Sequence, residues 1–170
     1  MKKRITIVLA VLSALLLGVG CSSHSSYWKG YGVTDYHDDP RYPEDYYWVS
    51  GVADMGSDTR ELTLCWVTLA ESKEVQVVCS LARRQMQGDA IIYWEDPEGE
   101  KVKIWDMLGQ SSGSGNGSYT LTKGTGRFLV RADKGEYEVG IGITDLGEEN
   151  VLYLDELPPS EQLDEFPPLG

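Results

Sequence analysis

The chemistry open to this chain is limited by the few nucleophilic and metal-binding residues it contains. Cys21, Cys65 and Cys79 are its cysteines, and His24 and His37 are its histidines. Both histidines precede the β-rich part of the chain, so a Ser-His-Asp or Cys-His arrangement inside that part would lack its base. A zinc site would lack its usual ligands there for the same reason. We therefore expect no catalytic residue, no metal site, no cofactor and no enzymatic activity.

Acidic residues leave two other kinds of chemistry to consider. Asp35, His37, Asp38 and Asp39 could surround a hard cation. Such a site needs fixed ligand geometry and supporting hydrogen bonds, which a segment without periodic apolar residues does not supply. Two inward carboxylates about 5–9.5 Å apart could hydrolyse a glycosidic bond. An acid-pair hydrolase is therefore an alternative.

Residues 1–20 are typical of a cleaved signal peptide. Three basic residues at positions 2–4 precede an apolar run at 5–17, and small residues follow it. The run is short for a membrane-spanning helix, which needs about 20 residues. A permanent N-terminal anchor helix is the alternative.

The segment Leu17-Gly18-Val19-Gly20-Cys21 resembles the lipobox of bacterial lipoproteins. It departs from the usual pattern at Gly18, where that family has leucine. The resemblance implies cleavage before Cys21 and lipidation of Cys21, which would hold the protein on a membrane of the cell envelope. Ser22, in place of aspartate, implies the outer membrane, with the chain facing the periplasm or the surface. Each buried methylene of the acyl chains contributes about 0.8 kcal/mol to such an anchor.

The net charge is unfavourable for nucleic-acid binding. The chain carries 15 Lys and Arg against 27 Asp and Glu, which gives a formal net charge of −12. A binder of nucleic acid needs cationic side chains to neutralise phosphates. We therefore expect no nucleic-acid partner.

Residues 21–45 are expected to form a polar tether between the lipid and the folded domain. This segment is rich in Ser, Asp, Pro and Gly and has no periodic apolar run. Six of the ten tyrosines nevertheless lie between Tyr27 and Tyr47, more than a spacer needs. Their rings could stack on a glycan or a protein partner, or they could fold back onto an apolar sheet face. The candidate binding residues of the tether are Trp28, Tyr31, Tyr36 and Tyr42.

Residues 46–145 predict an all-β domain, a single antiparallel β-sandwich, immunoglobulin-like or similar, of about eight strands. Short β-prone segments alternate with turn signals, and no stretch has a convincing helical period. A closed barrel is the alternative architecture. The expected strands lie near 46–53, 60–70, 74–82, 89–96, 100–106, 118–122, 126–132 and 136–144, with 151–155 as a candidate ninth.

A first hairpin is expected to turn near Ser72, which sets Cys65 opposite Cys79 on a face of alternating apolar residues. Opposed residues of a hairpin lie about 4.5–5.5 Å apart, a separation that a disulfide accepts. With Cys21 lipidated, these two cysteines remain to pair in an oxidising compartment. We therefore expect a Cys65–Cys79 disulfide, and two buried free thiols are the alternative.

A second hairpin is expected at Asp96-Pro97-Glu98-Gly99, which suits a type I turn followed by a left-handed glycine. The preferred register sets Trp94 opposite Val102 and Ile92 opposite Ile104, and a shift by one residue is the alternative.

A third hairpin is expected at Lys134-Gly135, with Val130 opposite Val139. The Gly- and Ser-rich residues 109–118 are expected to be a mobile connection, because they lack the lysine and following helix of a phosphate-binding loop.

Trp66 lies on the strand face opposite Cys65, where it makes that face partly apolar and a candidate binding surface. The segment 146–170 is acidic and contains two Pro-Pro pairs. We expect a solvated tail there, with a linear docking motif as the alternative.

These observations lead to one hypothesis and two alternatives. The chain is expected to be a lipid-anchored protein of the bacterial envelope that binds an unidentified envelope protein or glycan without catalysis. A periplasmic inhibitor of a basic hydrolase is the first alternative, because acidic residues steer such encounters. The acid-pair hydrolase is the second.

Overall fold

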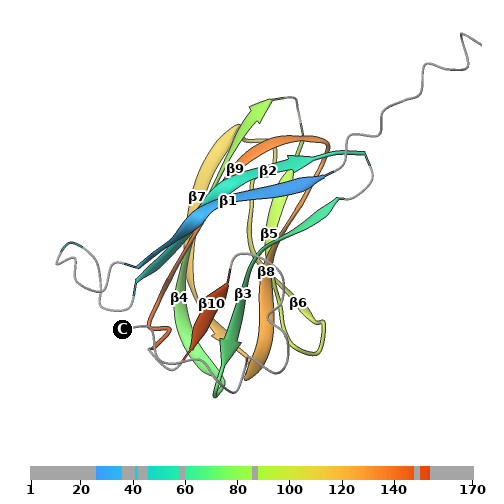
Figure 1. Ribbon diagram of the computed structural model, residues 1–170. Coiled ribbons are helices and arrows are strands. Elements are labelled where there is room, and N and C mark those ends of the chain that lie inside the picture. The colour runs from blue at the N-terminus through green and yellow to red at the C-terminus, as the bar shows by residue number, and fades with distance from the viewer. Residues whose placement is uncertain are drawn as a thin grey trace, which may run out of the picture.

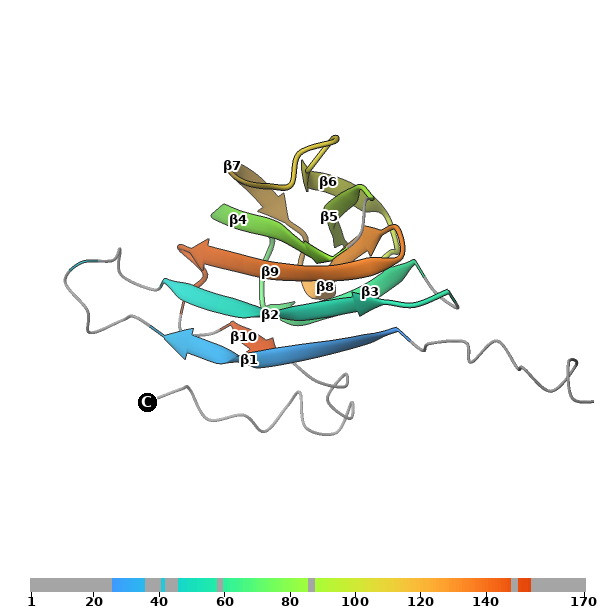
Figure 2. The ribbon, with the colours of Figure 1, turned by 90° about the horizontal axis from the view of Figure 1, so that it is seen from above.

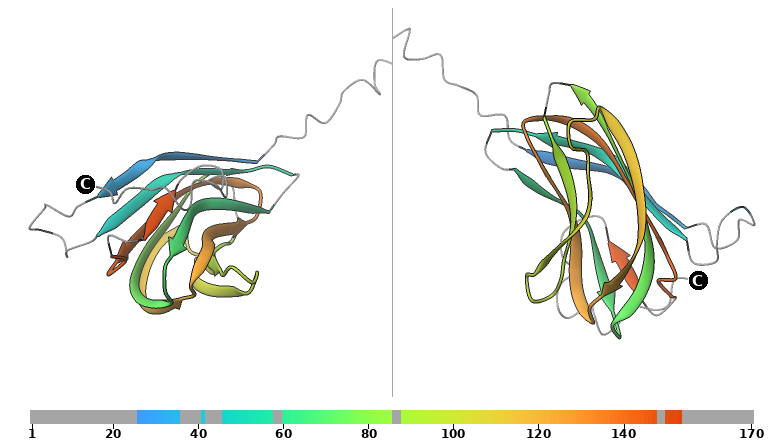
Figure 3. Two further views of the ribbon diagram at one scale, coloured as in Figure 1. Left: turned by 60° about the horizontal axis from the view of Figure 1, so that its bottom comes forward. Right: turned by 180° about the vertical axis from the view of Figure 1, so that it is seen from behind.

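The computed structural model describes residues 26–35, 41, 46–57, 60–85, 88–147 and 150–153. The predictions for the signal peptide, Cys21, Tyr36 and Tyr42 lie outside these residues, as does the tail beyond Tyr153. The described part forms two antiparallel sheets packed face to face, as Figures 1 and 3 show. The expected all-β sandwich is confirmed. No helix in the described part is long and apolar enough to span a membrane.

Each sheet has five strands. Sheet A has the order β1-β2-β9-β4-β7, which Figure 2 shows as a row from β1 to β7, and sheet B has the order β10-β3-β8-β5-β6. The strands are β1 (Tyr27–Asp35), β2 (Tyr47–Met55), β3 (Glu61–Leu69), β4 (Lys73–Gln85), β5 (Ala90–Glu95), β6 (Lys101–Asp106), β7 (Ser112–Leu121), β8 (Gly124–Ala132), β9 (Gly135–Thr144) and β10 (Val151–Tyr153).

The strand order is that of a jelly roll. Strands β2-β9-β4-β7 form four neighbours of sheet A, and β3-β8-β5-β6 form four neighbours of sheet B. Two interleaved Greek keys produce this order, which differs from the order of an immunoglobulin domain. Strand β1 then extends sheet A beside β2, and β10 extends sheet B beside β3.

Two of the three expected hairpins are wrong, because their strands belong to different sheets. Strands β3 and β4 lie in opposite sheets, and so do β8 and β9. The apolar residues that a hairpin register would pair side by side instead contribute to one core from opposite sheets. Alternation along a strand reports which face is buried and does not report which sheet receives the next strand.

The expected Cys65–Cys79 disulfide is wrong for the same reason. Cys65 lies in β3 and Cys79 in β4, and both are buried free thiols. The hairpin register that was expected to set the two cysteines side by side does not form, because β3 and β4 belong to different sheets. The two thiols therefore contribute to the core as small apolar side chains.

The hairpin of β5 and β6 is confirmed near its turn. Trp94 pairs with Val102, and Asp96 accepts hydrogen bonds from the backbone N–H groups of Glu98 and Glu100 at 2.9 and 2.8 Å. A register shift between Ile92 and Tyr93 then sets Ile92 opposite Trp105 in place of Ile104.

Two segments without strand-like composition are strands. Residues 27–35, expected in the tether, form β1 and pair with β2 from Tyr27↔Asp54 to Asp35↔Tyr47. Residues 112–117, expected in a mobile connection, form the first part of β7. Gly113 and Gly115 face inward there, and a Cβ atom at either would lie within 2.8 Å of the Trp105 ring. The glycines thus leave room for this ring from sheet B.

Candidate functional site: a groove across sheet A

A groove of about 560 Å³ lies on the outer face of sheet A. Residues from all five strands of the sheet line it, so the groove crosses the sheet from the β1 edge to the β7 edge. The lining residues are Tyr31, Trp48, Ser50, Gly51, Ser80, Leu81, Ala82, Ser112, Gly113, Ser114, Glu138, Val139 and Gly140.

Small residues on the central strands make the groove possible. A Cβ atom at Gly140 would lie 2.4 Å from Cζ2 of Trp48 and 2.7 Å from Oγ of Ser80. The Trp48 ring therefore rests directly against the backbone of β9, where any other residue would displace it. Two residues further on, a Cβ at Gly142 would lie 2.4 Å from the hydroxyl of Tyr46.

Tyr46 and Trp48 form an aromatic pair on this face. Their ring centroids are 6.4 Å apart and their planes differ by 32°. Tyr31 stands at the rim from β1, where 61% of its surface is exposed and a register shift between Gly30 and Gly32 leaves it outside the regular pairing. Aromatic rings and hydroxyl groups therefore lie on the same surface.

One ion-paired cluster adjoins the groove. Nε of Arg84 donates a hydrogen bond to Glu138 at 2.7 Å, and its Nη1 atom lies 3.1 Å from Glu136. These two carboxylates raise the pKa of Arg84 above its usual value. Glu138 is the one carboxylate among the described residues that line the groove, and it is ion-paired with Arg84.

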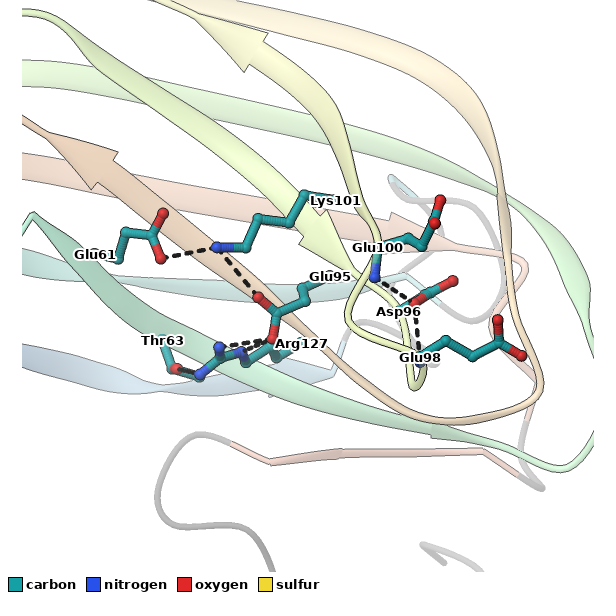
Figure 4. Close-up of polar contacts among 8 residues, drawn as sticks. All are labelled: Glu61, Thr63, Glu95, Asp96, Glu98, Glu100, Lys101 and Arg127. Carbon is teal, nitrogen blue, oxygen red and sulfur yellow. Dashed lines mark hydrogen bonds and ion pairs between the residues drawn. The ribbon is translucent and has the colours of Figure 1, made fainter.

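The outer face of sheet B carries a different arrangement, which Figure 4 shows. Nζ of Lys101 lies 2.8 Å from Glu61 and 3.3 Å from Glu95. Glu95 also accepts a hydrogen bond from Nε of Arg127 at 2.8 Å, and Arg127 donates another to Thr63 at 3.0 Å. We call these five residues the charge ladder.

The structure separates the predicted binding residues. Tyr31 lines the groove, whereas the partly buried Trp28 packs against the core, and a Cβ at Gly51 would lie 2.7 Å from its ring. Trp66 lies on sheet B, with the guanidinium carbon of Arg127 at 5.3 Å from its ring centroid. A cation already occupies one face of that ring, so a ligand would compete with it.

Sequence reasoning missed Trp48, an aromatic residue that lines the groove. A signal for it was available. Trp48 alternates with Tyr47 and Val49, so a half-buried strand would turn it outward while its neighbours face the core. Its support by Gly140 could not be inferred, because the pairing of β2 with β9 joins distant parts of the chain.

The thiols give no sign of a reactive site. Burial raises the pKa of Cys65 to about 12 and that of Cys79 to about 11. Cys79 also donates to the carbonyl of Gly115 at an Sγ–O distance of 3.6 Å. Among the described residues no group of His, Cys, Asp and Glu is arranged to hold a metal ion.

No protein-family model and no curated protein matches the chain. Among solved structures, a vicilin from Solanum melongena, reported with different anionic ligands in structurally similar pockets, aligns with 11% identity and a TM-score of 0.41. The alignment covers 89% of this chain and 36% of that chain, so this chain spans about a third of the vicilin. The carbohydrate-binding module CBM6cm-2 from Cellvibrio mixtus lichenase 5A, in complex with cellotriose, aligns with 14% identity and a TM-score of 0.29. That alignment covers 70% of this chain and 95% of the module.

Proposed function

We propose that this chain is a lipid-anchored binding module of the bacterial cell envelope that holds a glycan, without catalysis, in the groove of sheet A. The observation that carries this proposal is the Trp48 ring lying against the backbone of Gly140, beside serine hydroxyls. A sugar ring offers C–H groups on its faces and hydroxyl groups around its edge. An aromatic plane next to small hydroxyl side chains complements both kinds of group.

The rigidity of the groove favours binding. Trp48 is confined by Gly140 beneath it and by Tyr46 at its side, so little rotamer freedom remains to be lost when a ligand stacks on it. Ser50, Ser80 and Ser114 are short side chains with few conformations to restrict. Preorganised contacts of this kind improve affinity by lowering the entropy cost of association.

The shape of the groove favours an internal stretch of a linear chain over a chain end. Its lining includes Tyr31 on one edge strand and Ser112 on the other, so it crosses the whole width of the sheet. Four strand spacings of about 4.8 Å give a path of roughly 19 Å. Several consecutive sugar units could therefore contact the sheet together.

The binding proposal is tested by calorimetric titration of the full chain with soluble glycan fragments, including peptidoglycan fragments and linear neutral oligosaccharides. Trp48→Ala should weaken binding at least about 30-fold, which corresponds to about 2 kcal/mol. Trp66→Ala is the matched control on sheet B and should bind as the unchanged protein does.

Two results would contradict the glycan assignment. Equal losses from Trp48→Ala and Trp66→Ala would remove the groove as the site. Binding to basic hydrolases that weakens steeply with salt, with no glycan bound, would favour the inhibitor of a basic hydrolase instead.

The anchor is tested separately. Cys21→Ser should move the protein from the membrane fraction to the soluble fraction, because the acyl chains would be lost. Retention on membranes after a carbonate wash would contradict lipidation at Cys21 and leave the groove unaffected.

A further inference from the structure

Strand β7 is an edge strand of sheet A without the features that usually protect an edge. Figure 2 shows it at the end of the row, beyond β4. Its ten residues, Ser112–Leu121, include no charged residue and no proline, and their pairing with β4 contains no bulge. Every second residue of such a strand directs its N–H and C=O groups away from the sheet, where they can form hydrogen bonds with another strand.

The other edges differ from β7. Strand β6 carries Lys101, Lys103 and Asp106, and β1 contains a register shift at Gly30. Strand β10 is three residues long. Charged side chains, irregular pairing and short length each discourage edge-to-edge association. In a chain with a net charge of −12, an uncharged ten-residue edge is the place where a second copy can approach with the least repulsion.

The sequence of β7 is also complementary to itself. Residues 112–118 read Ser-Gly-Ser-Gly-Asn-Gly-Ser. In antiparallel pairing about a two-fold axis at Gly115, Gly113 meets Gly117, and Ser114 meets Asn116. Glycines thus oppose glycines, and small polar residues oppose small polar residues. A two-fold interface requires this correspondence, because each residue meets its counterpart from the same segment.

We propose that the protein forms a two-fold dimer through antiparallel pairing of β7 with β7 of a second copy, which joins the two A sheets into one. The outer faces of both sheets then lie on the same side. Each groove reaches Ser112 and Ser114, so the two grooves meet at the dimer axis. The dimer stands independently of the proposed function. If the groove does bind a glycan, one linear chain could contact both copies and gain avidity.

The first test measures the mass of the full chain in mild detergent by native mass spectrometry over a concentration series. The unchanged protein should appear at twice its monomer mass. Asn116→Lys with Ser118→Lys should shift it to the monomer, because both positions lie within the paired residues 112–118 and the interface would acquire four positive charges. Val102→Lys with Leu108→Lys adds the same charge at exposed positions outside sheet A and should leave the dimer intact.

The second test measures the register and requires no disruptive change. Ser114→Cys combined with Asn116→Cys should give a disulfide-linked dimer on a non-reducing gel, because positions 114 and 116 face one another across the axis. Either single-cysteine variant should form no linked dimer. Its cysteine would lie diagonally from the same cysteine of the second copy, beyond the roughly 7 Å that a disulfide spans. A monomer at all concentrations, or a dimer that survives the β7 lysines and forms no link in the double-cysteine variant, would overturn the proposal.

Discussion

The side chains on the two outer faces of this sandwich are held in place by different interactions. On sheet A, the central strands carry small residues, and the Trp48 ring lies in the space that Gly140 leaves open. On sheet B, long charged side chains span the strands and hold one another, with Glu95 bound to both Lys101 and Arg127. The first face leaves rings and hydroxyls available to a ligand, whereas the second satisfies its polar groups internally.

Under the proposed function, this difference separates the residues that bind the glycan from the residues that stabilise the fold. A change on sheet A should alter what the protein binds, and a change in the charge ladder should alter how well it folds.

Gly140→Val should have the largest effect. The new side chain would occupy the space of Trp48 and Ser80, so we expect glycan binding to fall at least about 100-fold together with an overpacking cost of about 1–3 kcal/mol. Calorimetric titration and urea unfolding measure the two quantities. Thr120→Val, on the same outer face but outside the groove, should change neither. Normal binding by Gly140→Val would contradict the role given to Trp48.

Arg127→Met should produce the reverse pattern. It leaves the partly buried Glu95 with Lys101 as its remaining cation and removes the hydrogen bond to Thr63. We expect the free energy of unfolding to fall by about 1–3 kcal/mol, while glycan affinity stays unchanged. Lys103→Met, at the more exposed pair with Asp106, is the matched control and should have little effect. A loss of affinity in Arg127→Met would show that the two faces are coupled.

The buried thiols of the core should make the free energy of unfolding depend on pH in the alkaline range. Cys65 has a pKa of about 12 and Cys79 about 11 when folded, against an ordinary value of 9.0. Below about pH 9 the thiols are protonated in both states and contribute no pH dependence. Above it the unfolded chain releases protons that the folded chain retains, so stability should fall as the pH rises toward 11–12.

Urea unfolding of the Cys65→Ala, Cys79→Ala double variant tests whether the thiols cause this loss of stability at alkaline pH. The variant should lose less stability over the same pH interval than the unchanged protein does. In the folded protein near neutral pH, iodoacetamide should leave both native thiols unmodified, and rapid alkylation there would contradict their burial.

Glu138→Gln should have the smallest effect. Arg84 keeps Glu136 as a partner, and the pair is exposed, so we expect no measurable change in unfolding. Glycan affinity should change less than in Trp48→Ala. A complete loss of binding would instead indicate that Glu138 contacts the ligand directly.

Local patterns in the sequence were sufficient for the fold class and for one hairpin. Alternating apolar residues and turn signals predicted an all-β sandwich, and the Asp96 turn predicted the pairing of Trp94 with Val102, both of which the structure confirms. They could not predict whether β3 and β4 share a sheet, because strands facing one another across a core have the same alternation as strands paired side by side.

The groove was less predictable than the fold. Tyr31 was identified from aromatic content, but the strand that carries it looked like a tether because Gly and Asp are uncommon in strands. The Gly and Ser residues of β7 obscured a strand in the same way. The contact of Trp48 with Gly140 depends on pairing between residues that are far apart in sequence, which periodicity does not report.

The crossings between sheets also have a consequence for how the chain reaches its fold. Of successive strands along the chain, β1 with β2 and β5 with β6 pair directly, whereas β3 with β4 and β8 with β9 separate into opposite sheets. Most strand pairs of the sandwich therefore form only after distant segments of the chain have met. The loss of chain entropy on closing these large loops comes before the stabilising contacts that compensate for it. Folding should be slow, and a newly made chain should therefore remain unfolded for longer than a chain built from locally paired hairpins.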